Sequence, residues 1–243
     1  MDVATPDTSA QSLPPPRLPV ADTWHTLLLL GIMAVWATLS YVGADVMRGS
    51  APPSRVPMYL KTMAMEWLVT GYIFWGVRRR GGTLRELIGG RWGGPLGFFL
   101  DVGIAAGFWL GAIFVLATVA LAIGAPRRLE AVSFMLPRGE GEMALWVLMA
   151  MTAGFCEEVI FRGYLQRQFT AWTRSAAAGI ALSAIAFGLG HVYQSGKSGV
   201  VIFVYGLMFG VLAHYRRSLR PGMMAHAWQD TVAGLLGNWL LRR

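Results

Sequence analysis

Two adjacent glutamates and an arginine interrupt an otherwise apolar stretch, GFCEEVIFR at residues 154–162. Ionised side chains at bilayer depth cost at least ~2.5–3.5 kcal/mol on insertion scales, so they normally face a partner or a hydrated cavity. Glu158 and Arg162 are four residues apart, which places them on one face of a helix with the acid N-terminal to the base. Glu157 is turned about 100° away around that helix. Arg162 can therefore neutralise Glu158, while Glu157 is left for chemistry.

Two further sets of polar residues follow in later apolar segments. His191 ends the stretch FGLGH, four residues after Phe187, and His226 lies four residues before Asp230 in HAWQD. Taken singly, each of the three sets has a structural interpretation: an ion pair between helices, a hydrogen-bonded histidine at a helix interface, or a mutual His–Asp hydrogen bond. Ionisable groups inside a membrane are expected to find one another. We therefore expect the three sets to converge on one site.

Such a site would support the hydrolysis of an amide by either of two routes. A glutamate beside a neutral histidine, shielded from bulk water, can hold a water molecule and deprotonate it as a general base. Histidine donors that face the attacked carbonyl can stabilise the developing oxyanion. Alternatively, a divalent metal such as Zn²⁺ could be held by carboxylate and imidazole ligands with an open position for water. The candidate ligands for that metal are Glu157, His191, His226 and Asp230.

The composition predicts an integral membrane protein. The 243 residues are 55% hydrophobic and 14% charged, whereas a soluble domain carries about 25% charged residues. The formal charge of +8 does not indicate a nucleic-acid partner, because the arginines separate apolar segments and do not cluster on a polar domain. Positive charge beside anionic lipid is the simpler account. We expect the lipid bilayer as a partner and no nucleic acid.

The apolar segments predict the fold class. A bilayer core of about 30 Å requires about 20 apolar residues per helix. About seven segments qualify, at residues 23–45, 57–77, 96–124, 142–168, 175–194, 198–215 and 220–240. The prediction is an all-α, multi-pass integral membrane protein with about seven transmembrane helices. We also expect a short interfacial helix around residues 84–88.

The chain divides into three parts on this basis. Residues 1–22 are rich in Pro, Ser and Thr and are predicted to be a disordered or extended arm. Residues 23–141 are predicted to form the amino-terminal transmembrane helices, and residues 142–243 a catalytic core made by the last four spans. Small residues along the fifth span, and the pair Gly206 and Gly210 in the sixth, favour close packing of this core.

Arginine positions favour a cytoplasmic amino terminus, because that orientation places most of them on the cytoplasmic side. Arginine far outnumbers lysine, which is typical of a G+C-rich genome. We expect a bacterial cytoplasmic membrane protein.

Other polar residues in the apolar segments have simpler interpretations. Glu66 and Asp101 are predicted to be helix–helix hydrogen-bond partners or interfacial groups, and His25 to lie at the membrane interface beside Trp24. The single cysteine, Cys156, excludes an internal disulfide and is expected to behave as a small buried hydrophobe.

The ordered stretches EEVIFR, FGLGH and HAWQD resemble the motifs EExxxR, FxxxH and HxxxN/D. These motifs belong to the CAAX-protease and bacteriocin-processing (CPBP) family of intramembrane endopeptidases, which includes the type II CAAX prenyl endopeptidases. The resemblance covers about residues 142–240, the last four predicted spans. It implies that Glu158 and Arg162 support the active site as an ion pair.

The resemblance also implies roles for the remaining residues. Glu157 would activate water together with His191. His226 with Asp230 would stabilise the oxyanion or share in binding a metal. Prenyl endopeptidases tend to carry asparagine where this chain has Asp230, and an ionised aspartate cannot donate a hydrogen bond to an oxyanion. Asp230 would have to be protonated, orient His226 or bind metal.

The predicted function is therefore intramembrane endopeptidase, acting on a membrane-associated peptide or protein with water activated by glutamate and histidine, with or without a metal. The alternative is a non-hydrolytic transporter or scaffold that uses the same buried cluster, because proton relays also employ Asp, Glu and His. Strict alternation of the spans places His191 and His226 toward opposite membrane faces. A shared site thus requires offset or tilted spans, or a fifth helix that continues past His191 to about Ser195.

Overall fold

The computed structural model describes residues 18–50, 54–90, 94–126 and 128–241, and within these ranges all regular structure is helical. Seven long helical segments stand at the seven predicted spans. Six of them are single helices: α1 (Thr23–Ser50), α2 (Val56–Arg79), α4 (Pro95–Ile123), α8 (Ala176–Gly190), α9 (Gly196–Arg216) and α10 (Arg220–Leu241). The all-α fold class is confirmed.

The fourth predicted span is one continuous rod made of three pieces. These are α6 (Glu140–Glu157), the π-helical segment η2 (Glu158–Leu165) and α7 (Gln166–Thr173). Three short elements complete the described chain: α3 (Leu84–Ile88), α5 (Arg128–Ala131) and the 3₁₀ turn η1 (Ser133–Met135). The helix expected around residues 84–88 is present, and a reciprocal capping box between Thr83 and Glu86 fixes its start.

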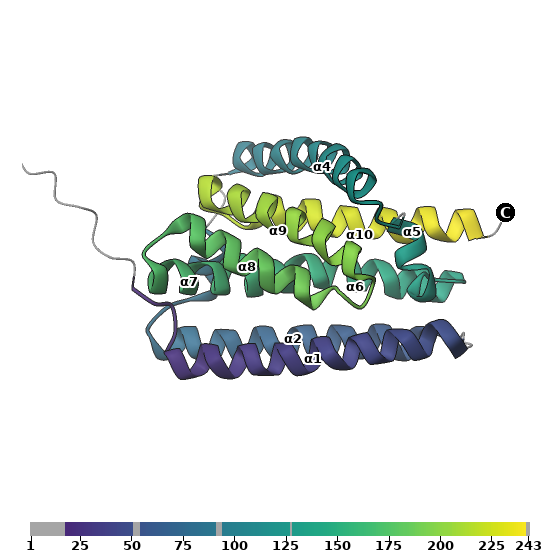
Figure 1. Ribbon diagram of the computed structural model, residues 1–243. Coiled ribbons are helices and arrows are strands. Elements are labelled where there is room, and N and C mark those ends of the chain that lie inside the picture. Colours follow the sequence, from purple (N-terminus) through teal and green to yellow (C-terminus); the bar gives the residue numbers. More distant parts are fainter. Residues whose placement is uncertain (1–17, 51–53, 91–93, 127, 242–243) are drawn as a thin grey trace, which may run out of the picture.

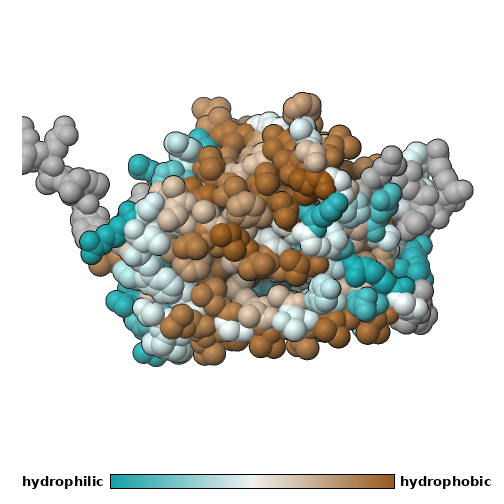
Figure 2. Space-filling model, viewed as in Figure 1, coloured by the Kyte–Doolittle hydropathy of each residue, from teal (hydrophilic) through white to brown (hydrophobic). Residues whose placement is uncertain are grey.

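Four of the long segments are by length and hydropathy able to cross a membrane: Thr23–Gly49, Pro95–Ile123, Glu140–Thr173 and Gly196–Arg216. This is fewer than the predicted seven. The apolar helix α8 is shorter than the others, and α10 carries polar groups that lower its hydropathy. The exterior nevertheless suits lipid, since Figure 2 shows apolar side chains across the middle of the visible face and polar ones toward its two ends. Phe114 and Leu121 of α4 are 75% and 83% exposed.

The helices form layers along one bundle axis (Figure 1). The pair α1 and α2 lies on one side, α4 lies on the opposite side over α9 and α10, and the rod of α6, η2 and α7 runs through the middle beside α8. The rod packs against α2 and α10, and α8 packs against α9 and α7. The carboxy-terminal end of α10 extends beyond the end of α8 (Figure 1). The rod, α8, α9 and α10 thus lie at the centre of the bundle, and its buried clusters also include residues of α1, α2 and α4.

Small residues allow the closest helix approaches in this core. A Cβ at Gly154 would lie 2.8 Å from the carbonyl oxygen of Met223 and 2.9 Å from the amide nitrogen of Ala227, so α6 and α10 meet there backbone to backbone. A Cβ at Gly206 would lie 3.1 Å from the Cα of Ala184, which is the corresponding approach of α9 and α8. The close packing predicted from small residues is confirmed at these positions.

The last residues of the predicted amino-terminal arm are bonded to α7. Residues 1–17 lie outside the described residues, but the backbone amides of Val20 and Ala21 donate to Oε1 of the fully buried Gln168 at 2.9 and 3.2 Å. Gln168 returns a bond from Nε2 to the Ala21 carbonyl at 3.0 Å. At the end of the disordered or extended arm predicted for residues 1–22, these bonds therefore hold residues 20 and 21 against α7.

His25, at the start of α1, is buried between helices. It is 1% exposed, its Nδ1 lies 2.8 Å from the Tyr164 hydroxyl and its Nε2 lies 3.0 Å from the Tyr72 carbonyl oxygen. Through these contacts His25 joins α1 to α2 and η2. Asp101 is a helix–helix partner as predicted, since it pairs with Arg216 at 3.1 Å and Arg220 at 2.9 Å.

Candidate active site

The buried pair Glu158 and Arg162 anchors the polar cluster at the centre of the bundle. Both residues lie in η2, which replaces the regular α-helix that we predict for this span. Arg162 Nη1 donates to Glu158 Oε1 at 2.9 Å, and each side chain is 1% exposed. Isolated π-helical turns within α-helices occur frequently at functional sites. The local change in helical winding thus coincides with the charged residues.

Aromatic rings and one backbone carbonyl complete the surroundings of Arg162. Its guanidinium carbon lies 4.3 Å from the ring centre of Phe187 and 4.8 Å from that of Phe209. Its Nη2 donates to the carbonyl oxygen of Gly206 at 3.4 Å. Cation–π contacts are strongest where the cation is desolvated. These contacts hold Arg162, and through it Glu158, in one orientation.

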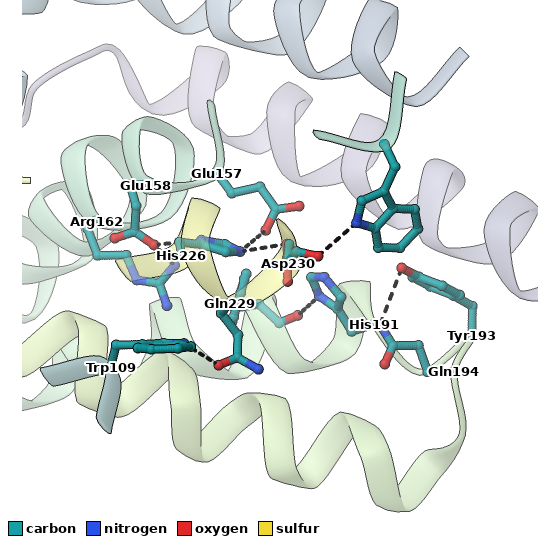
Figure 3. A network of polar contacts seen from close by, with 12 residues as sticks. Trp109, Glu157, Glu158, Arg162, His191, Tyr193, Gln194, His226, Gln229 and Asp230 are labelled. Atoms are coloured by element: carbon teal, nitrogen blue, oxygen red, sulfur yellow. Dashed lines mark hydrogen bonds and ion pairs between the residues drawn. The ribbon is translucent and has the colours of Figure 1, made fainter. Parts of the chain in front are cut away.

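The imidazole of His226 on α10 has carboxyl groups on both sides: those of Glu157 and Asp230 on one side and that of Glu158 on the other (Figure 3). Its Nδ1 is 3.2 Å from Glu158 Oε1, and its Nε2 is 3.6 Å from both Glu157 Oε2 and Asp230 Oδ2. The imidazole also stacks on Phe209, with ring centres 5.3 Å apart. A ring nitrogen that faces a carboxylate acts as a donor. Nδ1 is therefore the donor to Glu158, and Nε2 faces the other two carboxyl groups at ion-pair distance.

The two adjacent glutamates differ in solvent exposure and in their hydrogen bonds. The side chain of Glu157 is 17% exposed and that of Asp230 is 24% exposed, whereas Glu158 is 1% exposed. Oε2 of Glu157 has no hydrogen-bond partner among the described residues. Glu157 is thus the glutamate that a water molecule or substrate can approach, while Glu158 is committed to Arg162 and His226.

His191 follows the last residue of α8 and borders the same cluster. Its Nδ1 donates to the Phe187 carbonyl oxygen at 2.8 Å, because a carbonyl can only accept. In the neutral ring this leaves the lone pair on Nε2. The Phe187 ring lies between the two histidines, with centres 4.8 Å from His191 and 6.0 Å from His226. Within the described residues, no hydrogen bond or ion pair joins His191 to Glu157.

The predicted continuation of the fifth helix to about Ser195 is wrong. The helix α8 ends at Gly190, and residues 191–194 form a turn before α9. The alternative that we predicted, an offset between spans, fits Figure 1, where α10 reaches past the end of α8. The glycines near the end of α8 weaken continued helix formation.

Two residues near the site, Glu66 and Tyr193, lie outside the three predicted motifs. Glu66 of α2 lies within electrostatic reach of Glu157 and Asp230, and its Oε2 has no hydrogen-bond partner among the described residues. Tyr193 lies in the turn after α8, and burial together with carboxylates that include Glu157 and Asp230 raises its pKa to about 12. Glu66 was detectable in the sequence as an acid inside an apolar span, whereas a tyrosine in a turn gives no such signal.

The described side chains do not fit a metal centre. Among the residues that the structure describes, no three His, Cys, Asp or Glu side chains form a group that could hold a metal ion. His226 directs one nitrogen at Glu158 and the other at two carboxyl groups. We therefore assign no metal-dependent step to the four predicted ligands.

One comparison with known proteins identifies part of the chain. Residues 139–232 match the family described as type II CAAX prenyl endopeptidase Rce1-like. This part of the chain is similar to the CAAX-protease family. The resemblance predicted from the three motifs is thereby confirmed. No curated protein and no solved structure matches the chain.

The matched region contains all six predicted site residues, on the rod, in the turn after α8 and on α10. The similarity to this family indicates protease activity. Within the region, Trp146 of α6 donates from Nε1 to the Asp230 carbonyl oxygen at 2.7 Å, and it packs against Gly234. This bond fixes the turn of α10 that carries Asp230.

Proposed function

We propose that this protein is an intramembrane endopeptidase that hydrolyses a peptide bond of a membrane-associated peptide or protein with water activated by Glu157 and His191. The observation that carries the proposal is the difference in burial and bonding between Glu157 and Glu158. Glu158 is fully buried and bonded to Arg162, whereas Glu157 is partly exposed, and its Oε2 makes no hydrogen bond among the described residues and faces His226 Nε2 at 3.6 Å. A carboxylate so placed is free to accept a proton from water.

The hydrolysis would proceed in two steps. Water attacks the scissile carbonyl carbon while Glu157 takes one of its protons, so a C–O bond forms and the carbonyl π electrons move to oxygen. The C–N bond then breaks as Glu157 returns that proton to the leaving nitrogen, which gives a carboxylic acid and an amine. His191 would help to hold the water through the lone pair on Nε2. His226 would donate from Nε2 to the oxyanion.

The ion pair of Glu158 and Arg162 would position His226 without touching the substrate. Glu158 Oε1 receives hydrogen bonds from both Arg162 and His226. The carboxylate is thus shared by Arg162 and His226, and the imidazole plane is set by the bond at Nδ1. Preorganised donors of this kind require no rearrangement when the oxyanion forms.

The decisive experiment uses the full chain purified in detergent and a synthetic peptide library that contains lipidated and unlipidated members, with products read by mass spectrometry. Wild-type protein should cleave a subset of the peptides. Glu157→Gln and His191→Ala should abolish that cleavage while they retain the wild-type melting temperature. Cleavage by either variant at the wild-type rate would refute the assignment.

The same variants test the rival function. If the buried cluster serves transport, Glu157→Gln should change proton or ion flux in proteoliposomes while the wild-type protein cleaves nothing in the library. A scaffold would show neither cleavage nor flux. The family match over residues 139–232 supports the protease.

A further inference from the structure

The proposed reaction requires more oxyanion donors than the three motifs supply. An ionised Asp230 accepts hydrogen bonds and donates none. The indole N–H of Trp146 is already bonded to the Asp230 carbonyl oxygen. That of Trp109 donates to Gln229 Oε1 at 2.7 Å. Of the groups that these motifs contribute, His226 is thus the one donor assigned to the oxyanion.

Tyr193 places a phenol at the open side of this cluster. Figure 3 shows its hydroxyl directed toward the side of the site where His191 and Asp230 lie. Its ring centre is 5.9 Å from that of His191, and it lies within electrostatic reach of Glu157 and Asp230. The phenol thus borders the same partly exposed carboxylates that a substrate carbonyl would approach.

The hydroxyl proton of Tyr193 is not committed to another group. Its oxygen accepts a hydrogen bond from Gln194 Nε2 at 3.4 Å, and among the described residues it donates to none. A phenol both donates and accepts. Its proton is therefore free to bond an incoming oxygen atom.

Contacts from two other parts of the chain fix the position of this turn. Arg48 of α1 donates from Nη2 to the carbonyl oxygens of Tyr193 and Gln194, the latter at 3.0 Å. The guanidinium of Arg48 lies 4.7 Å from the Phe134 ring centre, and Phe134 meets Tyr193 edge to face. The phenol is thus held by contacts from α1 and η1, outside the family-matched region.

We infer that Tyr193 is a catalytic residue that donates a hydrogen bond from its hydroxyl to the oxyanion and so replaces the donor that Asp230 lacks. This inference rests on the proposed endopeptidase function. Tyr193 transfers no proton: its O–H bond strengthens an interaction with the carbonyl oxygen as that oxygen gains charge. His226 donates from the α10 side and Tyr193 from the turn after α8.

The first test is Tyr193→Phe, assayed with a library peptide that the wild-type protein cleaves. Loss of one oxyanion donor typically lowers kcat by about 10²–10³-fold, so we expect about a 100-fold fall in kcat with KM and melting temperature unchanged. The matched control is Tyr215→Phe, because Tyr215 is 80% exposed at the other end of α9. It should retain the wild-type kcat.

The second test repeats the substitution in Asp230→Asn, which supplies an amide donor at position 230. The kcat penalty of Tyr193→Phe should shrink to about tenfold or less in that background, since the two donors serve one oxygen atom. A purely structural tyrosine would show the same penalty in both backgrounds. If Asp230→Asn alone abolishes cleavage, Asp230 acts as an anion. The kcat of Tyr193→Phe in the otherwise wild-type protein then decides the role of Tyr193.

The inference and the proposed function fail in different ways. A wild-type protein that cleaves no peptide, or a Glu157→Gln variant that cleaves normally, overturns both. Full kcat in Tyr193→Phe, while Glu157→Gln is inactive, overturns the inference alone. A fall in kcat that is matched by a lower melting temperature also overturns it.

Discussion

His226 Nδ1 lies 3.2 Å from Glu158 Oε1, and this contact joins α10 to the π-helical segment of the central rod. The same oxygen accepts from Arg162 at 2.9 Å. Removal of one partner from a buried ion pair is strongly destabilising, because it leaves an uncompensated charge. The contact is thus both a structural link between helices and the feature that orients the imidazole.

Glu158→Gln should therefore lower both stability and activity. The variant leaves Arg162 without a counter-ion, so we expect a loss of about 3–5 kcal/mol in the free energy of unfolding and a fall in kcat through a misoriented His226. Thermal unfolding in detergent and peptide cleavage measure the two effects. Glu140→Gln, an exposed substitution at the start of α6, should change neither.

A double substitution separates the two roles of the ion pair. Replacement of a buried pair by apolar residues of similar volume is often neutral or stabilising, so Glu158→Leu with Arg162→Met should recover most of the lost melting temperature. It should not recover cleavage, because His226 then has no acceptor at Nδ1. Recovered activity in this double variant would contradict the positioning role.

Gly154→Ala tests whether the close approach of α6 and α10 sets the distance from Glu157 to His226. The added methyl group would meet backbone atoms of α10, which cannot move aside locally. Overpacking of this kind costs about 1–3 kcal/mol, and we expect at least a tenfold fall in kcat as the helices separate. Gly107→Ala in α4 is the control, since a Cβ there meets nothing within 4 Å. Equal kcat in the two variants would contradict this account.

The sequence predicts the helices well where apolar length alone determines them. Starts expected at residues 57 and 96 are found at Val56 and Pro95, because the bilayer-length criterion depends only on local composition. The end of α8 was predicted at residue 194 but lies at Gly190. An apolar run does not distinguish a helix from a turn that is held by contacts with distant residues, here with Arg48.

Residue spacing predicts only the pairs that lie on one helix, whereas the contact of His226 with Glu157 and Glu158 was expected from the three motifs taken together. The spacing of Glu158 and Arg162 indicates a pair whether the segment winds as an α- or a π-helix, so the pairing could be predicted while η2 could not. The positions of Glu66 and Tyr193 depend on how α2 and the turn after α8 pack against the rod. Such packing is not encoded in local spacing.

Chelation tests the metal that we considered from the residue types. Among the described residues, no three His, Cys, Asp or Glu side chains form a group that could hold a metal ion, so we expect cleavage to survive prolonged treatment with EDTA or 1,10-phenanthroline. Elemental analysis of the purified protein provides an independent measurement. Loss of cleavage on chelation, with restoration by Zn²⁺ and a stoichiometric metal content, would establish metal assistance and assign Glu157 to a ligand.

Arg48→Met tests whether contacts from α1 position Tyr193. The substitution removes the hydrogen bonds to the carbonyl oxygens of Tyr193 and Gln194 but keeps an unbranched side chain beside Phe134. We expect kcat to fall about three- to tenfold, less than in Tyr193→Phe, because the phenol remains but occupies its position for a smaller fraction of the time. Arg85→Met, an exposed substitution in α3, should leave kcat unchanged. Because a loosened turn acts only through the phenol, Arg48→Met should have no further effect on kcat in the Tyr193→Phe background, and additive penalties would show that Arg48 acts by another route.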